Sequence, residues 1–298
     1  MSVVPLRAPT PAGPVRASSE EGPRGPRWSL GTPFSYMAAF VIAGVTVVPI
    51  LYVVVSGFRT EAAINTTPVA WPHPWTTSNY SSILGSSAFW HYVGNSLFIA
   101  VVATGLSVGL GSLASFALAR YSFKGREALF GLFMVGLLFP AGVASLPLYL
   151  WLRKLGLLEN LMGVALPEAA FSLPYTIFIL RPFLRAVPGE LEDAAVVDGA
   201  TRIRFFRTVL VPLSRPALMT VAILGFIQSW NAYLLPLLVF NDQIHYTLPL
   251  GVASFQSTYS QNTAAILAFA ALSMVPALAF FVLAERRIVG SLTGALKG

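Results

Sequence analysis

Six apolar stretches, each about as long as a bilayer-crossing helix, constrain this chain more than any other feature. They cover residues 34–56, 95–119, 128–152, 163–180, 217–240 and about 263–284. Inside lipid every backbone N–H and C=O needs an internal partner, and an unbroken apolar run of this length obtains those partners as a helix. The sequence therefore predicts an all-α integral membrane protein with six transmembrane helices.

Composition supports a membrane protein and excludes several other classes. Of the 298 residues, 55% are hydrophobic and 10% are charged, whereas a soluble domain carries about 25% charged residues. Cysteine is absent, so the chain has no disulfide framework and no thiol catalyst. The formal charge is +7, but the basic residues lie in segments that connect apolar stretches. We therefore expect the lipid bilayer as a partner, and no nucleic acid.

Two of the stretches carry further signals. The second is rich in Gly and Ser, which favours close helix packing in lipid. The third contains Pro140 and Pro147, which predict a kink or a re-entrant shape. The segment 242–262 is too polar to span, and we expect it to be an external loop.

The basic residues also predict an orientation. All Lys and Arg residues except Arg59, Arg153 and Lys154 fall on one side of the six predicted spans. By the positive-inside rule both termini are then cytoplasmic. Residues 1–30 are rich in Pro and Arg and predict a disordered cytoplasmic tail. Residues 31–298 are predicted to form one six-span domain, ending in a cytoplasmic tail at 285–298.

The polar segment of about 188–216 lies between two spans and has the signals of a helix–turn–helix. Pro188 and the acids after it favour a helix start, and Asp198-Gly199 favours a helix stop with a turn. Thr201 can cap the second helix.

In that second helix, Ile203, Phe206 and Leu210 would share a face, and the arginines would take the remaining surface. Pro212 and Pro216 are expected to end the segment. A hairpin with exposed Phe and Arg at the membrane edge could dock a partner, or it could rest on lipid headgroups.

A search for catalytic chemistry finds none. The chain has no GxxxxGK[ST] phosphate loop, no HExxH, and no Ser with a paired His and acid. Its three histidines are scattered over connecting segments. We expect no catalytic and no metal site, and therefore no enzyme.

Polar side chains within the spans are candidates for a solute path. The second span offers Asn95, the fourth offers Glu168, and the fifth offers an aromatic among amides, namely Gln228, Trp230 and Asn231. A buried acid is costly and is therefore a functional candidate. Glu168 could instead be wet or paired with Arg153 or Lys154, and interhelical hydrogen bonds would explain the amides equally well.

The segment 188–216 resembles the EAA loop of binding-protein-dependent ABC importers. That pattern is Glu-Ala-Ala, three residues, Gly, nine residues and Ile-x-Leu-Pro. Here it reads Asp193-Ala194-Ala195, then Gly199, then Val209-Leu210-Val211-Pro212. From about residue 33 onward the chain is similar to the MalG-type carbohydrate permeases, in the segments ALARYSFKGRE, LPLYLWLRKLGLLEN, SWNAYLLPLL, YTLPLGVASFQ and VGSLTGALKG.

The resemblance implies the type I ABC importer permease fold in the bacterial cytoplasmic membrane. It implies a second homologous permease, two ATPase subunits that bind ATP and Mg²⁺, and an extracytoplasmic solute-binding protein as partners, with no cofactor in this chain. The hairpin would be the helix that couples to the ATPase. Its contact residues would be Glu190, Asp193, Ala194, Ala195, Asp198, Gly199, Ile203, Phe206 and Pro212.

The resemblance also implies transport of a sugar or oligosaccharide. Two alternatives remain open at this point. One is an importer of another polar solute, such as a glycerophosphodiester or a polyol. The other is an ion-coupled secondary transporter, for which paired intramembrane charges or inverted repeats would be expected.

Overall fold

A computed structural model describes residues 31–140, 142–258 and 262–295, with side chains for 33–140, 142–254 and 262–282. Within those ranges the regular structure is helical and contains no strand, so the all-α prediction is confirmed for them. The predicted tail 1–30 lies outside the described residues, as do residues 296–298 of the predicted tail 285–298.

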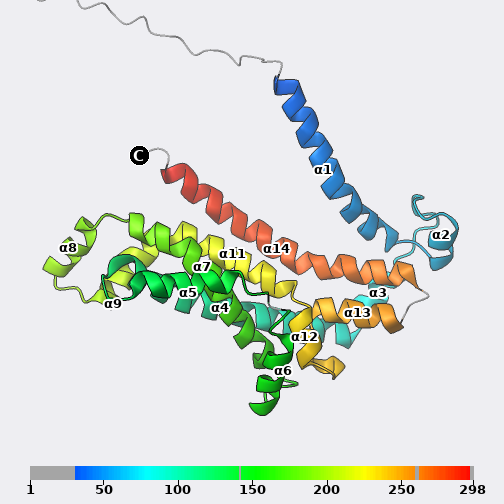
Figure 1. Ribbon diagram of the computed structural model, residues 1–298. Helices are drawn as coiled ribbons and strands as arrows, with labels where there is room; N and C mark the ends of the chain where they lie inside the picture. Colours follow the sequence, from blue (N-terminus) through cyan, green and yellow to red (C-terminus); the bar gives the residue numbers. More distant parts are fainter. Residues whose placement is uncertain (1–30, 141, 259–261, 296–298) are drawn as a thin grey trace, which may run out of the picture. The chain divides into compact units, whose positions relative to one another are not determined.

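The chain divides into two compact units, Met1–Val48 and Pro49–Gly298. Helix α1 (Gly31–Ser56) contains the first predicted span, and the described side chains of its portion before Pro49 are nearly all exposed. The second unit holds the remaining helices (Figure 1). Their bounds are α2 (Glu61–Thr66), α3 (Ser78–Leu84), α4 (Ser87–Arg120), α5 (Arg126–Leu137), α6 (Ser145–Lys154), α7 (Met162–Ala186), α8 (Glu190–Val197), α9 (Arg202–Phe205), the π-helix η1 (Phe206–Leu210), α10 (Val211–Leu213), α11 (Arg215–Trp230), α12 (Leu234–Val239), the 3₁₀-helix η2 (Gln243–His245), α13 (Leu248–Thr258) and α14 (Thr263–Ala295).

The packing of α4 against α7 is the most extensive helix–helix contact in the described part of the chain. Small buried residues recur on α4 every three or four positions, and they are Ser96, Ala100, Ala103, Ser107, Gly111 and Ser115. Their spacing forms one face of the helix, and small side chains let two backbones approach closely. Ser107 Oγ lies 2.9 Å from Thr176 Oγ1 on α7. The predicted role of small residues in the second span is confirmed, although α4 begins at Ser87 instead of residue 95.

Prolines explain why two predicted spans are broken. The stretch 128–152 is divided between α5 and α6, and the stretch 217–240 between α11 and α12. Pro147 is the third residue of α6, and Pro236 is the third residue of α12. Proline is tolerated in the first turn of a helix. Farther inside a helix it disrupts the turn before it, because it has no N–H and its ring clashes with the carbonyl four residues earlier. The break between α5 and α6 agrees with the kink or re-entrant shape predicted for the third span. The prediction of a continuous fifth span was wrong, because α11 and α12 are separate helices.

Two more expectations need correction. Pro212 and Pro216 do not end the hairpin segment. Each is the second residue of a new helix, α10 and α11 respectively. The segment 242–262, expected to be a loop, contains η2 and α13, and α13 packs against α4 and α14.

Four described helices are long and apolar enough to cross a membrane, namely Pro33–Ser56, Ser87–Arg120, Met162–Ala186 and Thr263–Val282. The pair Arg202–Leu213 and Arg215–Trp230, bent by 79°, would make a fifth. The number six and the cytoplasmic termini stay predictions.

A buried arginine organises the turn after α1. Arg59 is 1% exposed, and its guanidinium donates to the carbonyls of Pro68, Ala63 and Thr67 at 2.5–2.9 Å. Asn79 in α3 donates to the carbonyl of Arg59 at 2.9 Å. Arg59 therefore holds a compact turn together, so a charge counted above as a topology signal has a structural role.

The α4–α7 contact predicts opposite effects for two glycines on α4. A Cβ at Gly111 would lie 2.5 Å from Thr176 Cγ2, whereas nothing lies within 4 Å of a Cβ at Gly109. We expect Gly111→Ala to lower stability by about 1–3 kcal/mol through overpacking. Gly109→Ala should leave it unchanged or raise it by up to about 1 kcal/mol, since Ala is the better helix former. Thermal unfolding of the two variants in the same detergent tests this difference. Equal shifts in Tm would contradict a close contact between α4 and α7 at Gly111.

Candidate functional site

The hairpin formed by α8 and α9 has the local structure that its sequence predicted. Helix α8 starts with three acids in its first turn, namely Glu190, Glu192 and Asp193. Gly199 follows with φ +76°, in the left-handed region that glycine adopts without steric cost. Thr201 Oγ1 then accepts a hydrogen bond from Arg204 N at 3.3 Å and caps α9. Helix caps and turns depend on neighbouring residues, which is why they were predictable here.

The apolar side chains of α9 and η1 attach the hairpin to the helical body. Phe206 and Leu210 are buried with Phe116 of α4 and Leu184 of α7, and the rings of Phe116 and Phe206 are 5.0 Å apart. The expectation of an exposed Phe206 was therefore wrong, since only 8% of this residue is exposed. Ile203 does not join this cluster and remains 61% exposed.

An ion pair that was not predicted joins the hairpin to the end of α4. Arg120 Nη2 and Nε each lie 2.8 Å from Glu192 Oε2, and Arg120 Nη1 donates to the carbonyl of Val187 at 2.7 Å. The side chains of Arg120 and Glu192 are 8% and 20% exposed. The sequence offered one signal for this pair. A single basic residue ends the second apolar span, and a run of acids lies in the later connecting segment 188–216. Because the pair is largely buried and Arg120 also donates to the carbonyl of Val187, we expect it to stabilise the fold more than an exposed ion pair does.

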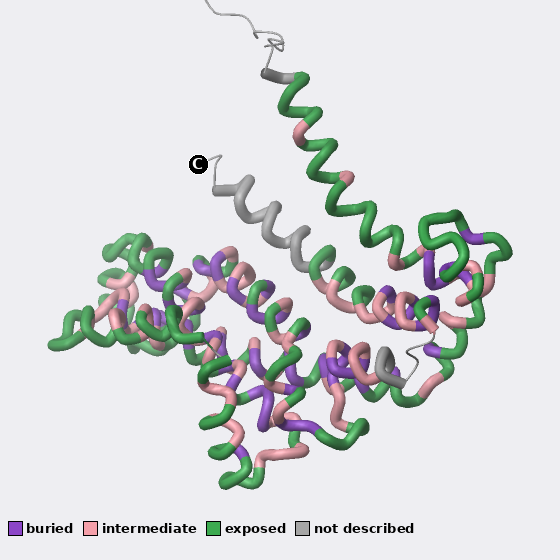
Figure 2. Tube along the Cα trace, turned by 45° about the vertical axis from the view of Figure 1, so that its right-hand side comes forward, coloured by how far each residue is buried: buried purple, intermediate pink, exposed green. Residues whose placement is uncertain are grey.

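The opposite face of the hairpin is open. Most of the predicted contact residues are exposed, whereas Ala195 and Pro212 are half-buried and Phe206 is buried; the exposed ones are Glu190, Asp193, Ala194, Asp198, Gly199 and Ile203. Large apolar residues lie among them, with Val196 63% and Val197 86% exposed. Figure 2 shows α8 almost entirely as exposed tube at one end of the helical body. Clustered exposed apolar residues indicate a contact surface.

The five predicted solute-path residues do not form one group. Asn95 Nδ2 donates to the carbonyls of Ile244 and Tyr246 at 2.8 and 3.0 Å and thereby holds η2 against α4. Trp230 is 3% exposed and stacks on Phe226. Asn231 Nδ2 donates to the carbonyl of Ile227 in its own helix at 2.8 Å. These three side chains have local structural roles. The hydrogen bonds of Asn95 reach another segment, as the alternative reading proposed, whereas that of Asn231 stays within one turn of its own segment.

The remaining two residues line one cavity of about 230 Å³ between α6, α7, α11 and α12. Glu168 accepts a hydrogen bond from the hydroxyl of Ser229, which lies beside Gln228 on α11. Among the described residues, no ion pair joins Glu168 to Arg153 or Lys154. The described residues also contain no group of His, Cys, Asp or Glu suited to a metal ion.

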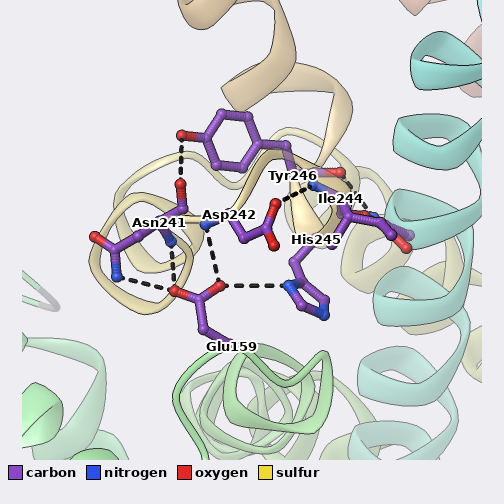
Figure 3. Close-up of polar contacts among 7 residues, drawn as sticks. Glu159, Asn241, Asp242, Ile244, His245 and Tyr246 are labelled. Carbon is purple, nitrogen blue, oxygen red and sulfur yellow. Dashed lines mark hydrogen bonds and ion pairs between the residues drawn. The ribbon is translucent and has the colours of Figure 1, made fainter.

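A second polar cluster, also not predicted, joins the α6–α7 connection to the segment after α12 (Figure 3). Glu159 Oε1 accepts from Asn241 N and Nδ2 at 2.6 and 2.9 Å. Its Oε2 accepts from Asp242 N at 3.3 Å and lies 3.3 Å from His245 Nδ1. Burial opposes ionisation of Glu159, but these donors and the charge on protonated His245 outweigh it, so the pKa of Glu159 is lowered from its ordinary value. An acid in a short connection between spans carries no distinguishing sequence pattern.

The described residues form a helical body with an exposed hairpin at one end, and comparison with known proteins identifies the class of protein. The family model of the binding-protein-dependent transport system inner membrane component matches residues 107–290. The chain belongs to this family. The predicted resemblance to importer permeases is thereby confirmed.

Particular relatives narrow the comparison. The chain is similar to the diacetylchitobiose uptake system permease protein DasC of Streptomyces coelicolor, with 38% identity over 85% of this chain and 92% of the relative. It is also similar to the diacetylchitobiose uptake system permease protein NgcG of the same organism, with 34% identity over 84% of this chain and 83% of the relative. In fold it is similar to a chain of a bacterial ABC transporter involved in the import of the acidic polysaccharide alginate. The TM-score is 0.74 and the identity 22%, and the match covers 88% of this chain and 99% of that chain.

The Arg120–Glu192 pair predicts a measurable coupling energy. Truncating either residue leaves a largely buried partner unpaired, so a double-mutant cycle of Arg120→Ala and Glu192→Ala should give a coupling of about 1–3 kcal/mol. Glu190 lies in the same first turn but is exposed, so Glu190→Ala combined with Arg120→Ala is the matched control and should show almost no coupling. The readout is the Tm of each variant in detergent. Equal coupling energies for Glu192 and Glu190 would contradict a specific Arg120–Glu192 ion pair.

The Glu159 cluster predicts an acid-sensitive contribution to stability. Because folding lowers the pKa of Glu159, its carboxylate stabilises the fold above the ordinary pKa of 4.5, and this stabilisation is lost as the pH falls through the lower folded-state value. At neutral pH, Glu159→Gln should cost about 0.5–1.5 kcal/mol. The difference in Tm between wild type and this variant should shrink from neutral pH to about pH 3. Glu190→Gln, at an exposed site, should show no such trend; a constant difference for Glu159→Gln would refute the interpretation.

Proposed function

We propose that this chain is a permease subunit of an ABC importer for a sugar or oligosaccharide, and that it forms one half of the translocation pathway. The hairpin is the observation that carries the proposal. It is fixed to α4 and α7 by Arg120, Phe206 and Leu210, and it presents Asp193, Ala194 and Gly199 outward. A surface that is rigidly attached on one side and open on the other can pass a movement from a partner to the spans.

The partner at this surface is a separate ATPase subunit, which supplies ATP and Mg²⁺ chemistry that the permease lacks. Two ATPase copies, a second homologous permease and an extracytoplasmic solute-binding protein complete the importer. Closure of the ATPase dimer rocks the spans between inward-open and outward-open states. The family match and the names of the relatives support this assembly and a saccharide as the solute.

We propose six passes through the bacterial cytoplasmic membrane, with both termini on the cytoplasmic side. The pairs α5 with α6 and α11 with α12 each form one broken pass, alongside α1, α4, α7 and α14. Non-helical breaks at membrane depth are tolerated where they are buried in protein or line a cavity. The distribution of Lys and Arg supports the orientation.

Gly199 provides the test of this proposal. The Gly199→Asp variant places a side chain and a charge at the exposed turn, at a cost of about 1–2 kcal/mol for the left-handed backbone. Gly199→Asn is the matched control, because Asn also tolerates this conformation and adds no charge. We expect Gly199→Asp to insert normally, to lose at least about tenfold in ATP-driven saccharide uptake and to retain less ATPase in a mild-detergent pull-down than Gly199→Asn. Wild-type uptake by Gly199→Asp, or no ATPase with the wild-type chain, would overturn the assignment.

A further inference from the structure

The second half of the hairpin carries positive charge that no described group neutralises. The segment 199–241 contains no acid, and its basic residues are Arg202, Arg204, Arg207 and Arg215. All four are exposed, and no ion pair joins any of them to a described acid. Arg202 lies over the ring of Tyr121, with its guanidinium carbon 4.6 Å from the ring centre. The other three guanidinium groups are open to a partner.

Two of these arginines share one face of their segment. Thr208 Oγ1 donates to the carbonyl of Arg204 at 2.8 Å, so the helical path continues from α9 into η1. Arg204 and Arg207 are three positions apart, and side chains at that spacing are neighbours on a helix surface. Another face of the segment is already occupied, because Phe206 and Leu210 are buried against α4 and α7. The arginine face therefore points away from the chain's own core.

The bend after this segment sets the orientation of that face in a bilayer. The segment 202–213 makes an angle of 79° with α11, which crosses the membrane in the proposed topology. A segment nearly perpendicular to a spanning helix runs nearly parallel to the membrane surface, as interfacial amphipathic helices do. Arg215 is the first residue of α11 and marks the same depth. This geometry brings the three arginines to the level of the lipid phosphates.

The two halves of the hairpin differ in charge and therefore suit different partners. The segment 186–201, which contains α8, has no Lys or Arg, and its acids are Glu190, Glu192, Asp193 and Asp198. An anionic membrane surface repels α8 and attracts the arginine side. Guanidinium groups also match phosphate in shape, since they can donate two parallel hydrogen bonds to it. Charge and geometry thus favour lipid phosphate on the arginine side only.

We infer that Arg204, Arg207 and Arg215 form a binding surface for the headgroups of anionic phospholipids. This inference rests on the proposed function, which places the hairpin at the cytoplasmic side of the membrane, and it adds a second partner for the hairpin. The lipid holds the segment 202–213 at the membrane surface, while α8 extends toward the ATPase.

The absence of cysteine allows a bimane fluorophore to be attached at one chosen position. Thr208→Cys places it on the exposed side of the segment that carries Arg204 and Arg207, and Ala194→Cys, exposed on α8, is the matched control. The labelled chain is placed in phosphatidylcholine nanodiscs that contain a small fraction of doxyl-labelled lipid. We expect doxyl-phosphatidylglycerol to quench position 208 at least roughly tenfold more effectively than doxyl-phosphatidylcholine, with no such preference at position 194. Both lipids carry a phosphate, so the difference measures net charge.

Substitutions then assign the preference to individual arginines. Arg204→Gln and Arg207→Gln should each lower it about fivefold, the factor that one basic residue contributes near an anionic surface. Arg207→Lys retains the charge and should keep most of the preference. Arg153→Gln removes the same charge from an exposed residue on the opposite side of the predicted spans, and it should change nothing. An unchanged preference in the Arg204→Gln, Arg207→Gln double variant, or an equal loss in Arg153→Gln, would overturn the inference.

The ATPase is the competing occupant of the arginine surface. If it binds there, the double variant loses ATPase in a mild-detergent pull-down and position 208 of the otherwise wild-type chain shows no lipid preference, which overturns the lipid surface. If the importer takes up saccharide with ATP but position 208 shows no preference, the lipid surface is wrong and the proposed function stands. If the preference behaves as expected but uptake needs no ATP, the proposed function is wrong and the lipid surface stands.

Discussion

The close approach of α4 and α7 is the contact on which the rest of the structure depends. Their backbones can come together because Gly111 has no side chain where Thr176 lies, and because the buried hydroxyls of Ser107 and Thr176 hydrogen-bond to each other. At one end of this pair, Arg120 ends α4 and α7 leads into the hairpin, so the spacing of the two helices sets the distance that the Arg120–Glu192 pair must bridge. Farther along the same pair, α7 contributes Glu168 to the cavity. Both candidate surfaces therefore inherit their geometry from one helix contact.

The parts of the fold that depend on neighbouring residues were predictable from the sequence. Long apolar runs predicted α1, α4, α7 and α14, and the turn at Gly199 with the cap at Thr201 followed from local chemistry. The break between α11 and α12 was missed, because hydropathy continues across it and only the position of Pro236 reveals it. Phe206 was misplaced for a different reason. An amphipathic pattern shows that one face is apolar, but it does not show whether that face meets the same chain or another one.

The sequence indicated which residues could belong to a site, but it did not indicate which of them lie together in the fold. An acid and an amide inside apolar stretches drew attention to Glu168 and Gln228, but their sharing of one cavity depends on how α7 meets α11. Asn95, Trp230 and Asn231 carried the same kind of signal and proved to hold local structure. Glu159 gave almost no signal, since a single charge in a polar connection is ordinary, and its role comes from partners far along the chain.

The 79° bend sets the segment 202–213 nearly at right angles to α11. A force along the segment 202–213 would therefore act nearly at right angles to the axis of α11, and it would turn that helix instead of pushing it along its length. Helix α11 has 16 residues and is about 24 Å long, which is the lever arm. A rotation of about 10° would therefore displace its far end, where Gln228 and Ser229 line the cavity, by about 4 Å. A displacement of that size exceeds the reach of a hydrogen bond, so a small turn at one end of α11 can open or close a binding geometry at the other.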